Sequence, residues 1–433
     1  NRYNLNTGVY KHFRYDPSSS QSLSSDFVTS IIRDRNGDLW VGTWGAGLNR
    51  LAKQQGTFQR FSLPPGLVSS YVSSVEEDKR GDLWIGTLGG ISRYNQLEGR
   101  FEVIFSDQTS TKITNVGCLL FDNENSLWVG SRFGLYHLQS ADGFQSDISV
   151  KHYRHNDNDP SSISGNYVIS LKQTYDGSIW IGTYGQGVNR LVQKEDSVWF
   201  ESYGASSGLS NTVVYGIEED RLKNLWFSTD YGLSKFNPTN KTYRNYFQAD
   251  GFLNNQYYWS ASYKNMAGKL YFGGMNGLDA FFPEGIQQDV SGSETTITNL
   301  NLLNEPVKPG QLYNDVEVLS RSIYNAESIE LSYKEKVVGF EFSALNYQEP
   351  GMVRYAYILE NFEKEWNYVS SNRRYASYTN LKPGNYLFKV KSSGGNGEFD
   401  GPVRTIAIHI NPPFWDTVWF RALSIVGLIL LDK

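Results

Sequence analysis

One short sequence pattern recurs six times through the first two thirds of this 433-residue chain. Each copy joins a polar turn, an apolar run with one aromatic residue, a glycine-rich turn and a second apolar run, as in GDLWVGTWGAGLNRL and GSIWIGTYGQGVNRL. Successive aromatic residues lie 44, 44, 52, 46 and 45 positions apart, and a repeat of this length is typical of one β-propeller blade. These residues are Trp40, Trp84, Trp128, Trp180, Trp226 and Tyr271.

Each repeat contains four strand-like runs, because apolar and β-branched stretches alternate with Gly, Asn and Asp. A four-stranded sheet cannot bury both of its faces alone. We therefore expect the sheets to stack around an axis, with the repeated tryptophans in the core between neighbouring blades. In the first repeat the runs are Phe27–Arg33, Leu39–Thr43, Gly47–Leu51 and Thr57–Phe61.

The opening residues, NRYNLNTGVYKHFRYDP, match the third and fourth strands of the same unit. Six repeats plus this half-unit predict a seven-bladed propeller, with the first half of one blade lying upstream. The alternative is a six-bladed ring closed by the N-terminal strand. In either form the predicted propeller covers residues 1–286.

A different pattern begins after Phe282, beyond a polar link at 287–294. About seven short strand-like runs follow, and that number is typical of an immunoglobulin-like β-sandwich. The sequence therefore predicts an all-β chain in which a sandwich at 287–411 follows the propeller. The expected sandwich strands lie near Ile297–Leu303, Ser328–Leu331, Val337–Ala344, Arg354–Leu359, Ala376–Thr379, Tyr386–Ser392 and Arg404–Ile410.

The last segment, 412–433, is nearly all apolar from Trp415 to Leu431. It is shorter than the roughly 20 residues that cross a bilayer. We interpret it as the start of a transmembrane helix, with Trp415 and Trp419 as anchors at the membrane interface. A buried C-terminal helix is the alternative interpretation.

Composition supports this architecture and excludes several functions. Aromatic residues make up 15% of the chain and glycines number 41, which favours many short strands. The net charge is -5 without a basic cluster, so we expect no nucleic-acid binding. The single cysteine, Cys118, allows no internal disulfide, and no histidine spacing suits zinc, so we expect neither a metal nor another cofactor.

The repeats resemble the two-component regulator propeller, through a D-x-x-G-x-L-W-x-G-T core. The tail resembles the tyrosine-rich Y_Y_Y sandwich domain that follows such propellers. Three repeats depart from the pattern, at Asn123–Asn125, Ser228 and Tyr271, which puts equal blade geometry in doubt. The matching residues are Asp34, Gly37, Leu39, Trp40, Gly42 and Thr43 in the first repeat, and Tyr355, Tyr357, Trp366, Tyr378, Pro383, Gly384 and Tyr386 in the tail.

The resemblance implies the periplasmic sensor region of a hybrid two-component receptor in the bacterial inner membrane. Members of this family join such a region, through one membrane span, to a cytoplasmic histidine kinase. We expect this region itself to be non-catalytic and to signal as a homodimer through the sandwich. The alternatives are the sensor of a diguanylate cyclase, or a membrane-anchored propeller that binds a partner protein.

A ligand site is predicted where two sets of loops meet on one face of the propeller: those that precede the first strand of each blade and those that join its second and third strands. Aromatic rings beside Asn, Asp and Arg suit a sugar, so we expect a small polar ligand such as an oligosaccharide. The alternative is that these side chains only fill the rim or contact another propeller. The predicted ligand-binding residues are Trp44, Tyr71, Arg132, Phe133, Tyr167, Tyr184, Asp230, Tyr231, Tyr258, Trp259 and Asn276.

Overall fold

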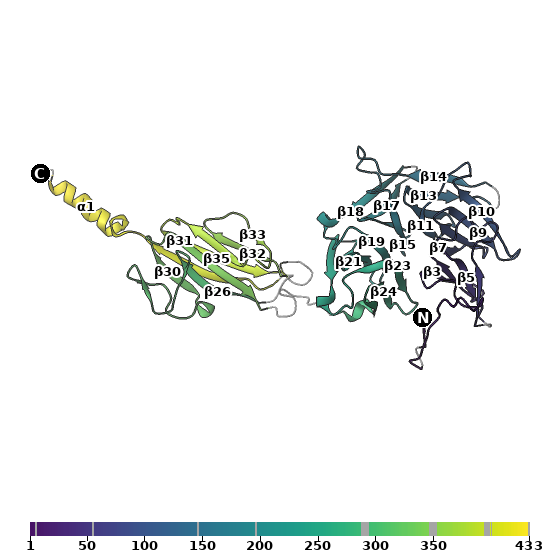
Figure 1. The fold of residues 1–433 in the computed structure, drawn as a ribbon. Helices are drawn as coiled ribbons and strands as arrows, with labels where there is room; N and C mark the ends of the chain where they lie inside the picture. The colour runs from purple at the N-terminus through teal and green to yellow at the C-terminus, as the bar shows by residue number, and fades with distance from the viewer. Residues whose placement is uncertain are drawn as a thin grey trace. The chain divides into compact units, whose positions relative to one another are not determined.

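The computed structural model describes residues 1–4, 7–53, 56–144, 147–194, 197–286, 294–345, 353–393, 399 and 401–431. The chain divides into two compact units, Asn1–Ile286 and Gln287–Lys433 (Figure 1). Most of the polar link predicted at 287–294 lies outside the described residues. Each unit is described by itself below.

The described part of the first unit contains six antiparallel sheets, here called blades 1 to 6, in which each strand pairs with the next along the chain (Figure 1). Five blades have four strands and blade 6 has three. An additional hairpin, β1 (Arg2–Tyr3) with β2 (Tyr10–Lys11), precedes them. Blade 1 contains β3 (Val28–Arg33), β4 (Leu39–Thr43), β5 (Gly47–Leu51) and β6 (Phe58–Phe61); blade 2 contains β7 (Val72–Glu77), β8 (Leu83–Thr87), β9 (Gly90–Asn95) and β10 (Arg100–Ser106); blade 3 contains β11 (Val116–Phe121), β12 (Leu127–Ser131), β13 (Gly134–Gln139) and β14 (Ser149–Tyr153); blade 4 contains β15 (Val168–Gln173), β16 (Ile179–Thr183), β17 (Val188–Lys194) and β18 (Ser197–Tyr203); blade 5 contains β19 (Val214–Glu219), β20 (Leu225–Thr229), β21 (Leu233–Asn237) and β22 (Thr242–Tyr246); blade 6 contains β23 (Tyr257–Lys264), β24 (Leu270–Gly274) and β25 (Gly277–Phe281).

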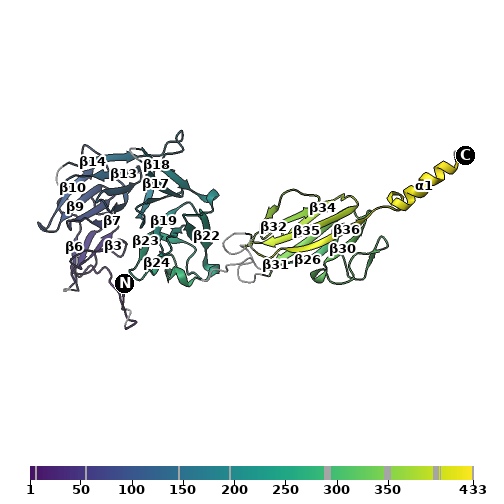
Figure 2. The ribbon, with the colours of Figure 1, turned by 180° about the vertical axis from the view of Figure 1, so that it is seen from behind.

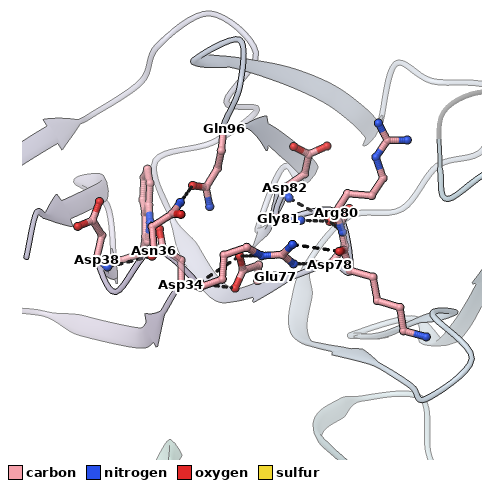
Figure 3. A network of polar contacts seen from close by, with 12 residues as sticks. Asp34, Asn36, Asp38, Glu77, Asp78, Arg80, Gly81, Asp82 and Gln96 are labelled. Atoms are coloured by element: carbon pink, nitrogen blue, oxygen red, sulfur yellow. Dashed lines mark hydrogen bonds and ion pairs between the residues drawn. The ribbon is translucent and has the colours of Figure 1, made fainter.

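The aspartate of the repeat holds the first turn of a blade to its tryptophan. Asp34 is buried, and its carboxylate accepts hydrogen bonds from Trp40 Nε1 (2.8 Å) and from the backbone N–H of Asp38 (2.9 Å). Asp78 makes the same pair of contacts in blade 2, and Figure 3 shows both aspartates with the turn residues around them. The recurring Asp and Trp therefore form one structural clamp.

Neighbouring blades pack through the face that carries the tryptophan. Trp40 has no exposed surface and shares a core with Val72 and Val75 of blade 2. A Cβ at Gly42 would lie 2.6 Å from Val72 Cγ1, so the glycine of the repeat lets the next blade approach closely. Beside this core, Arg35 of blade 1 forms an ion pair with Glu77 of blade 2 at 2.7 Å.

The first and last blades of the series each keep one apolar face uncovered. Val28 and Ile31 of blade 1 are 41% and 66% exposed, whereas Val72 and Val75, at the corresponding positions of blade 2, are 0% and 3% exposed. In blade 6, Tyr263 is also exposed. Within the described residues, no further blade covers these two faces as the other blades cover one another.

The second unit is a β-sandwich of two sheets, and Figure 2 labels most of their strands. Its core lies between the sheets, where the ring of Phe340 stacks on that of Phe388 at 4.4 Å. All seven expected strands are present, with ends shifted by at most two residues. One sheet has the order β27 (Glu305–Pro306), β26 (Thr295–Leu302), β31 (Val337–Ala344), β34 (Tyr375–Thr379); the other has the order β30 (Ser328–Ser332), β36 (Arg404–Asn411), β35 (Gly384–Ser392), β32 (Tyr355–Glu360), β33 (Asn367–Val369); a small hairpin pairs β28 (Leu312–Tyr313) with β29 (Val316–Glu317).

A single α-helix, α1 (Val418–Leu431), ends the described part of the chain. Before it, the indole of Trp415 meets the ring of Tyr333 edge to face at 5.6 Å, which ties the start of the apolar segment to the sandwich. None of the helices in the described ranges has both the length and the apolar character required to cross a membrane.

Candidate ligand-binding site

The two loops of each blade that carry predicted site residues are hydrogen-bonded to each other through their backbones. In blade 1 the N–H of Trp44 donates to Phe27 O (3.0 Å), and in blade 4 the N–H of Tyr184 donates to Tyr167 O (2.8 Å). Each bond joins the loop after the second strand to the loop before the first. The expectation that these two sets of loops share a face therefore agrees with the geometry of the described loops.

A pocket of about 670 Å³ opens between these loops, and we call it the mouth pocket. It takes residues from blades 1, 2, 3, 4 and 6, so that segments more than 200 positions apart in the sequence meet there. Five of the predicted residues line it: Trp44, Arg132, Tyr167, Tyr258 and Trp259. The others lining it are Phe27, Val28, Thr29, Ser73, Leu88, Asn115, Val116, Gly117 and Ser260.

Three rings form the most tightly associated part of the site. The centroid of Tyr167 lies 5.3 Å from that of Tyr184 and 5.8 Å from that of Trp259, and the centroids of Tyr184 and Trp259 are also 5.8 Å apart. Burial raises the pKa of Tyr167, so its hydroxyl stays neutral at physiological pH. Tyr215 extends the cluster, with its centroid 6.1 Å from that of Trp259 and its hydroxyl donating to Asp230 at 2.9 Å.

An irregularity in the innermost strand of blade 6 brings Trp259 to the mouth pocket. Tyr257 pairs with Gly274 and Ser262 pairs with Phe272, so the intervening residues of β23 leave the ladder. Other blades have a smaller irregularity at this point, as between Val28 and Ser30 in β3. Ser260 adopts a φ of 52°, in the left-handed region that few non-glycine residues occupy. Such strained backbone is concentrated at functional sites.

The remaining predicted residues are not among those that line the mouth pocket. Tyr71 meets Trp44 edge to face at 5.3 Å. Asp230 accepts hydrogen bonds from Tyr215 and Gln256, each at 2.9 Å. The others have neighbours outside the pocket: Tyr231 packs against Phe247 at 5.1 Å, Asn276 donates its backbone N–H to Asn254 at 2.7 Å, and Phe133 offers its carbonyl oxygen to His152 at 3.0 Å.

Sequence reasoning did not single out Phe27, Ser73 or Ser260 as site residues. Phe27 and Ser73 belong to loop and strand positions that look like ordinary parts of the repeat. Only Ser260 had a local signal, because the run NNQYYWSAS replaces the short apolar strand found in the other repeats.

A second hollow of about 540 Å³, here called the side pocket, adjoins this cluster and shares Tyr167 with the mouth pocket. It is lined mostly by polar side chains. His155 is held there by Ile163 O (2.8 Å) and by the carboxylate of Asp157 (2.9 Å). These hydrogen bonds raise the pKa of His155 above its usual value, the bond to Ile163 most of all. The lining residues are His155, Asp157, Ser164, Gly165, Asn166, Tyr167, Thr183, Tyr184 and Gln186.

No group of three or more His, Cys, Asp or Glu side chains that would suit a metal ion is found in the part of the chain that the structure describes. Cys118 is buried, and burial raises the pKa of its thiol well above the ordinary range. The chemistry of the mouth pocket is therefore that of rings, hydroxyls, amides and one guanidinium.

Two protein-family models match segments of this chain, one in each unit. A model of the two-component regulator propeller matches residues 22–45, 66–89, 162–185 and 208–231, and a model of the Y_Y_Y domain matches residues 346–411. The chain carries two-component regulator propeller repeats and a Y_Y_Y domain. The predicted resemblance is thus confirmed, and the matched repeats fall on blades 1, 2, 4 and 5.

The relatives are longer than this chain. Histidine kinase P4 of Formosa agariphila is 26% identical over 334 residues, which cover 76% of this chain and 24% of that protein. The extracellular domain of the hybrid two-component system BT3049 of B. thetaiotaomicron is 25% identical, with a TM-score of 0.46, and the match covers 93% of this chain and 57% of that one. The corresponding domain of BT4673 is 17% identical, with a TM-score of 0.42 and coverages of 96% and 72%. This chain therefore spans about a quarter of the curated relative.

Proposed function

We propose that this chain is the periplasmic, ligand-sensing part of a membrane-bound two-component receptor, and that its mouth pocket binds a carbohydrate fragment. The regulator repeats, the Y_Y_Y domain and the similarity to a protein named as a histidine kinase support the receptor. One observation supports a carbohydrate ligand: aromatic rings from several blades line the mouth pocket, which has a volume of about 670 Å³. Such rings stack on the C–H faces of sugars, while nearby hydroxyl and amide groups bind their hydroxyls.

The direct test is isothermal titration calorimetry of the purified chain against a panel of neutral and acidic oligosaccharides. Saturable binding that weakens at least roughly tenfold when Trp259 is replaced by alanine supports the proposal. Binding that is unchanged in this variant would place the ligand elsewhere. If no member of the panel binds to a folded sample, the mouth pocket is better explained as a contact for a partner protein.

We infer that this region does not itself catalyse glycoside cleavage. That reaction ordinarily uses two carboxylates that flank one bond. The candidate carboxylates are engaged separately, since Asp26 accepts the N–H of Tyr15 at 2.8 Å and Asp230 accepts from Tyr215 and Gln256. Neither belongs to the residues that line the mouth pocket. Recovery of an intact oligosaccharide after long incubation with the protein would support this inference, and release of shorter products would contradict it.

We further propose that a seventh blade, supplied by upstream residues, completes the propeller. The exposed faces of blades 1 and 6 support it, since Ile31 corresponds to the buried Val75 of blade 2 and Tyr263 of blade 6 is also exposed. The β1–β2 hairpin supports it as well. Its turn bonds Gly8 N to Asn4 O at 2.8 Å, as the turn between β9 and β10 of blade 2 bonds Gly99 N to Asn95 O at 2.9 Å.

For transmission we propose a two-state homodimer. A ligand in the propeller favours one arrangement of two chains, the sandwiches transmit the change, and the paired helices beyond Trp419 change their separation or rotation. A ligand shifts such a balance only by its differential affinity for the two states. The output would be a histidine kinase, or alternatively a diguanylate cyclase; a membrane-anchored propeller that binds a partner protein is the remaining alternative. Sedimentation of the chain with and without ligand tests the dimer, and a monomer under both conditions would contradict it.

A further inference from the structure

The position of Arg132 in the mouth pocket follows from the backbone of blade 3. It stands in the short loop between β12 and β13, where its backbone N–H donates to Asn115 O at 3.1 Å. The guanidinium carbon then lies 5.6 Å from the centroid of Tyr167, within the range of a cation–π contact. Tyr167 is itself supported by Tyr184 and Trp259. The charged end of Arg132 is therefore held at the aromatic cluster.

Arg132 is the one charged residue among the fourteen that line the mouth pocket. Across the described residues, its side chain takes part in no hydrogen bond or ion pair. Arginines elsewhere in the propeller are engaged differently: Arg50 pairs with Asp38 at 2.5 Å and Arg93 pairs with Glu102 at 2.6 Å. The mouth pocket thus contains a positive charge whose hydrogen-bond donors are free to contact a ligand.

The nearby carboxylate that sequence reasoning placed at the site does not neutralise this charge. Asp230 is bonded to Tyr215 and Gln256 and is not part of the pocket wall. The remaining wall is made of rings, aliphatic groups, backbone, and the neutral side chains of Ser, Thr and Asn. A charge beside such walls is less screened than one in open water, so it discriminates strongly between neutral and anionic ligands.

We propose that the ligand of the mouth pocket is an acidic sugar, whose carboxylate or sulfate group pairs with Arg132 while its ring lies against the aromatic cluster. A guanidinium presents its donors as a planar fork that matches two oxygens of such a group. This inference rests on the proposed function, because it names the chemical class of the same ligand.

The test uses calorimetry with matched pairs of probes. Tetragalacturonate is compared with its methyl ester, a glucuronate oligosaccharide with its reduced neutral form, and a sulfated galactan oligosaccharide with its desulfated form. The acidic member of at least one pair is expected to bind more tightly, and the pair that responds tells a carboxylate ligand from a sulfated one. Affinity for that member should fall between 50 and 500 mM salt, because the contact is ionic.

Two substitutions complete the test. Arg132→Gln should weaken the acidic probe by roughly ten- to a hundredfold and leave its neutral partner unchanged, the range expected for hydrogen bonds to a charged group. Arg132→Lys should retain part of the affinity, because it keeps the charge and loses the fork. Arg14→Gln, which changes an exposed arginine outside the pocket, is the matched control. Thermal unfolding should be nearly equal for all variants, since the Arg132 side chain makes no hydrogen bond or ion pair with the described residues and its one contact, the cation–π contact with Tyr167, contributes little to stability.

The outcomes separate this inference from the proposed function. Trp259-dependent binding of neutral sugars alone would overturn the acidic ligand and keep the sugar sensor. An acidic probe that binds equally well to Arg132→Gln would also overturn it. If no probe binds to the folded protein, both the acidic ligand and the proposed sugar sensor are contradicted.

Discussion

The ring of Trp259, from blade 6, meets the ring of Tyr167, from blade 4, at an angle of 64° with centroids 5.8 Å apart. The two residues are far apart in the sequence and come from blades that are not consecutive along the chain. Their contact therefore depends on the irregular course of β23 as well as on the arrangement of the blades.

Replacing Trp259 by alanine should reduce ligand affinity at least roughly tenfold, the loss typical of a buried aromatic anchor. Some stability should be lost as well, because the partly buried ring packs against Tyr167, Tyr184 and Tyr215. Titration calorimetry and thermal unfolding together check both expectations. Tyr324→Ala removes an exposed ring from the sandwich and serves as the control. Equal affinities of the two variants would exclude Trp259 from the site.

The side pocket should matter only for longer ligands. It shares Tyr167 with the mouth pocket, so a chain of several sugar units bound at the mouth can continue into it. Gln186→Ala removes an exposed amide from its wall and should weaken a tetrasaccharide severalfold, while a disaccharide is unaffected. Competition binding with a series of chain lengths measures this, and equal effects on every length would show that the side pocket is not used.

The turn clamp should contribute strongly to the stability of the propeller. Asp34→Ala leaves the buried Trp40 Nε1 and the Asp38 N–H without their acceptor, which should cost about 3 kcal/mol of unfolding free energy. Urea unfolding followed by tryptophan fluorescence checks the value. Glu124→Ala removes an exposed carboxylate from a corresponding turn and should change little. A similar loss in both variants would mean that the clamp has no special role.

The stability of the propeller should fall as pH rises through neutrality because of Glu76. Burial raises the pKa of this glutamate in β7 from 4.5 to about 7, although the charge of Lys172 acts in the opposite direction. The folded protein therefore binds this proton more tightly than the unfolded chain does. The resulting stabilisation is complete below pH 4.5 and is lost as pH rises through about 7.

Glu76→Gln mimics the protonated side chain and should abolish that part of the pH dependence. At pH 8 the variant should be more stable than the native protein by about 1–2 kcal/mol, a value reduced because the side chain is partly accessible to solvent. Unfolding midpoints at pH 5 and pH 8 measure the difference. An equal pH dependence in native protein and variant would assign the effect to another group.

The regular part of this structure could be predicted from the sequence because it depends on local signals. The turn aspartate marks the same strand end in blades 1, 2, 3 and 5, where it bonds the repeated tryptophan, and the sandwich strands lie within two residues of their expected positions. The run NNQYYWSAS marks Tyr258 to Ala261 as irregular, but the contact of Trp259 with Tyr167 could not be predicted, since it joins blades that are distant in the sequence. Asp230 and Asn276 lie in the expected loops, but their side chains are hydrogen-bonded to Tyr215 and to Leu253 O. The sequence could not predict these partners, because they come from other segments of the chain.

The proposed seventh blade makes Ile31 a sensitive reporter. In the chain as it stands, Ile31 is 66% exposed, so Ile31→Ser should change the unfolding free energy by less than about 0.5 kcal/mol. In a longer chain that includes the upstream residues, the new blade should bury this side chain, and the same substitution should cost about 2 kcal/mol. Val75→Ser is the control, because Val75 is 3% exposed and should be costly in both chains. Urea unfolding of the four variants against the two parent chains gives the comparison. If Ile31→Ser is harmless in the longer chain as well, upstream residues do not cover this face, and a six-bladed ring becomes the better description.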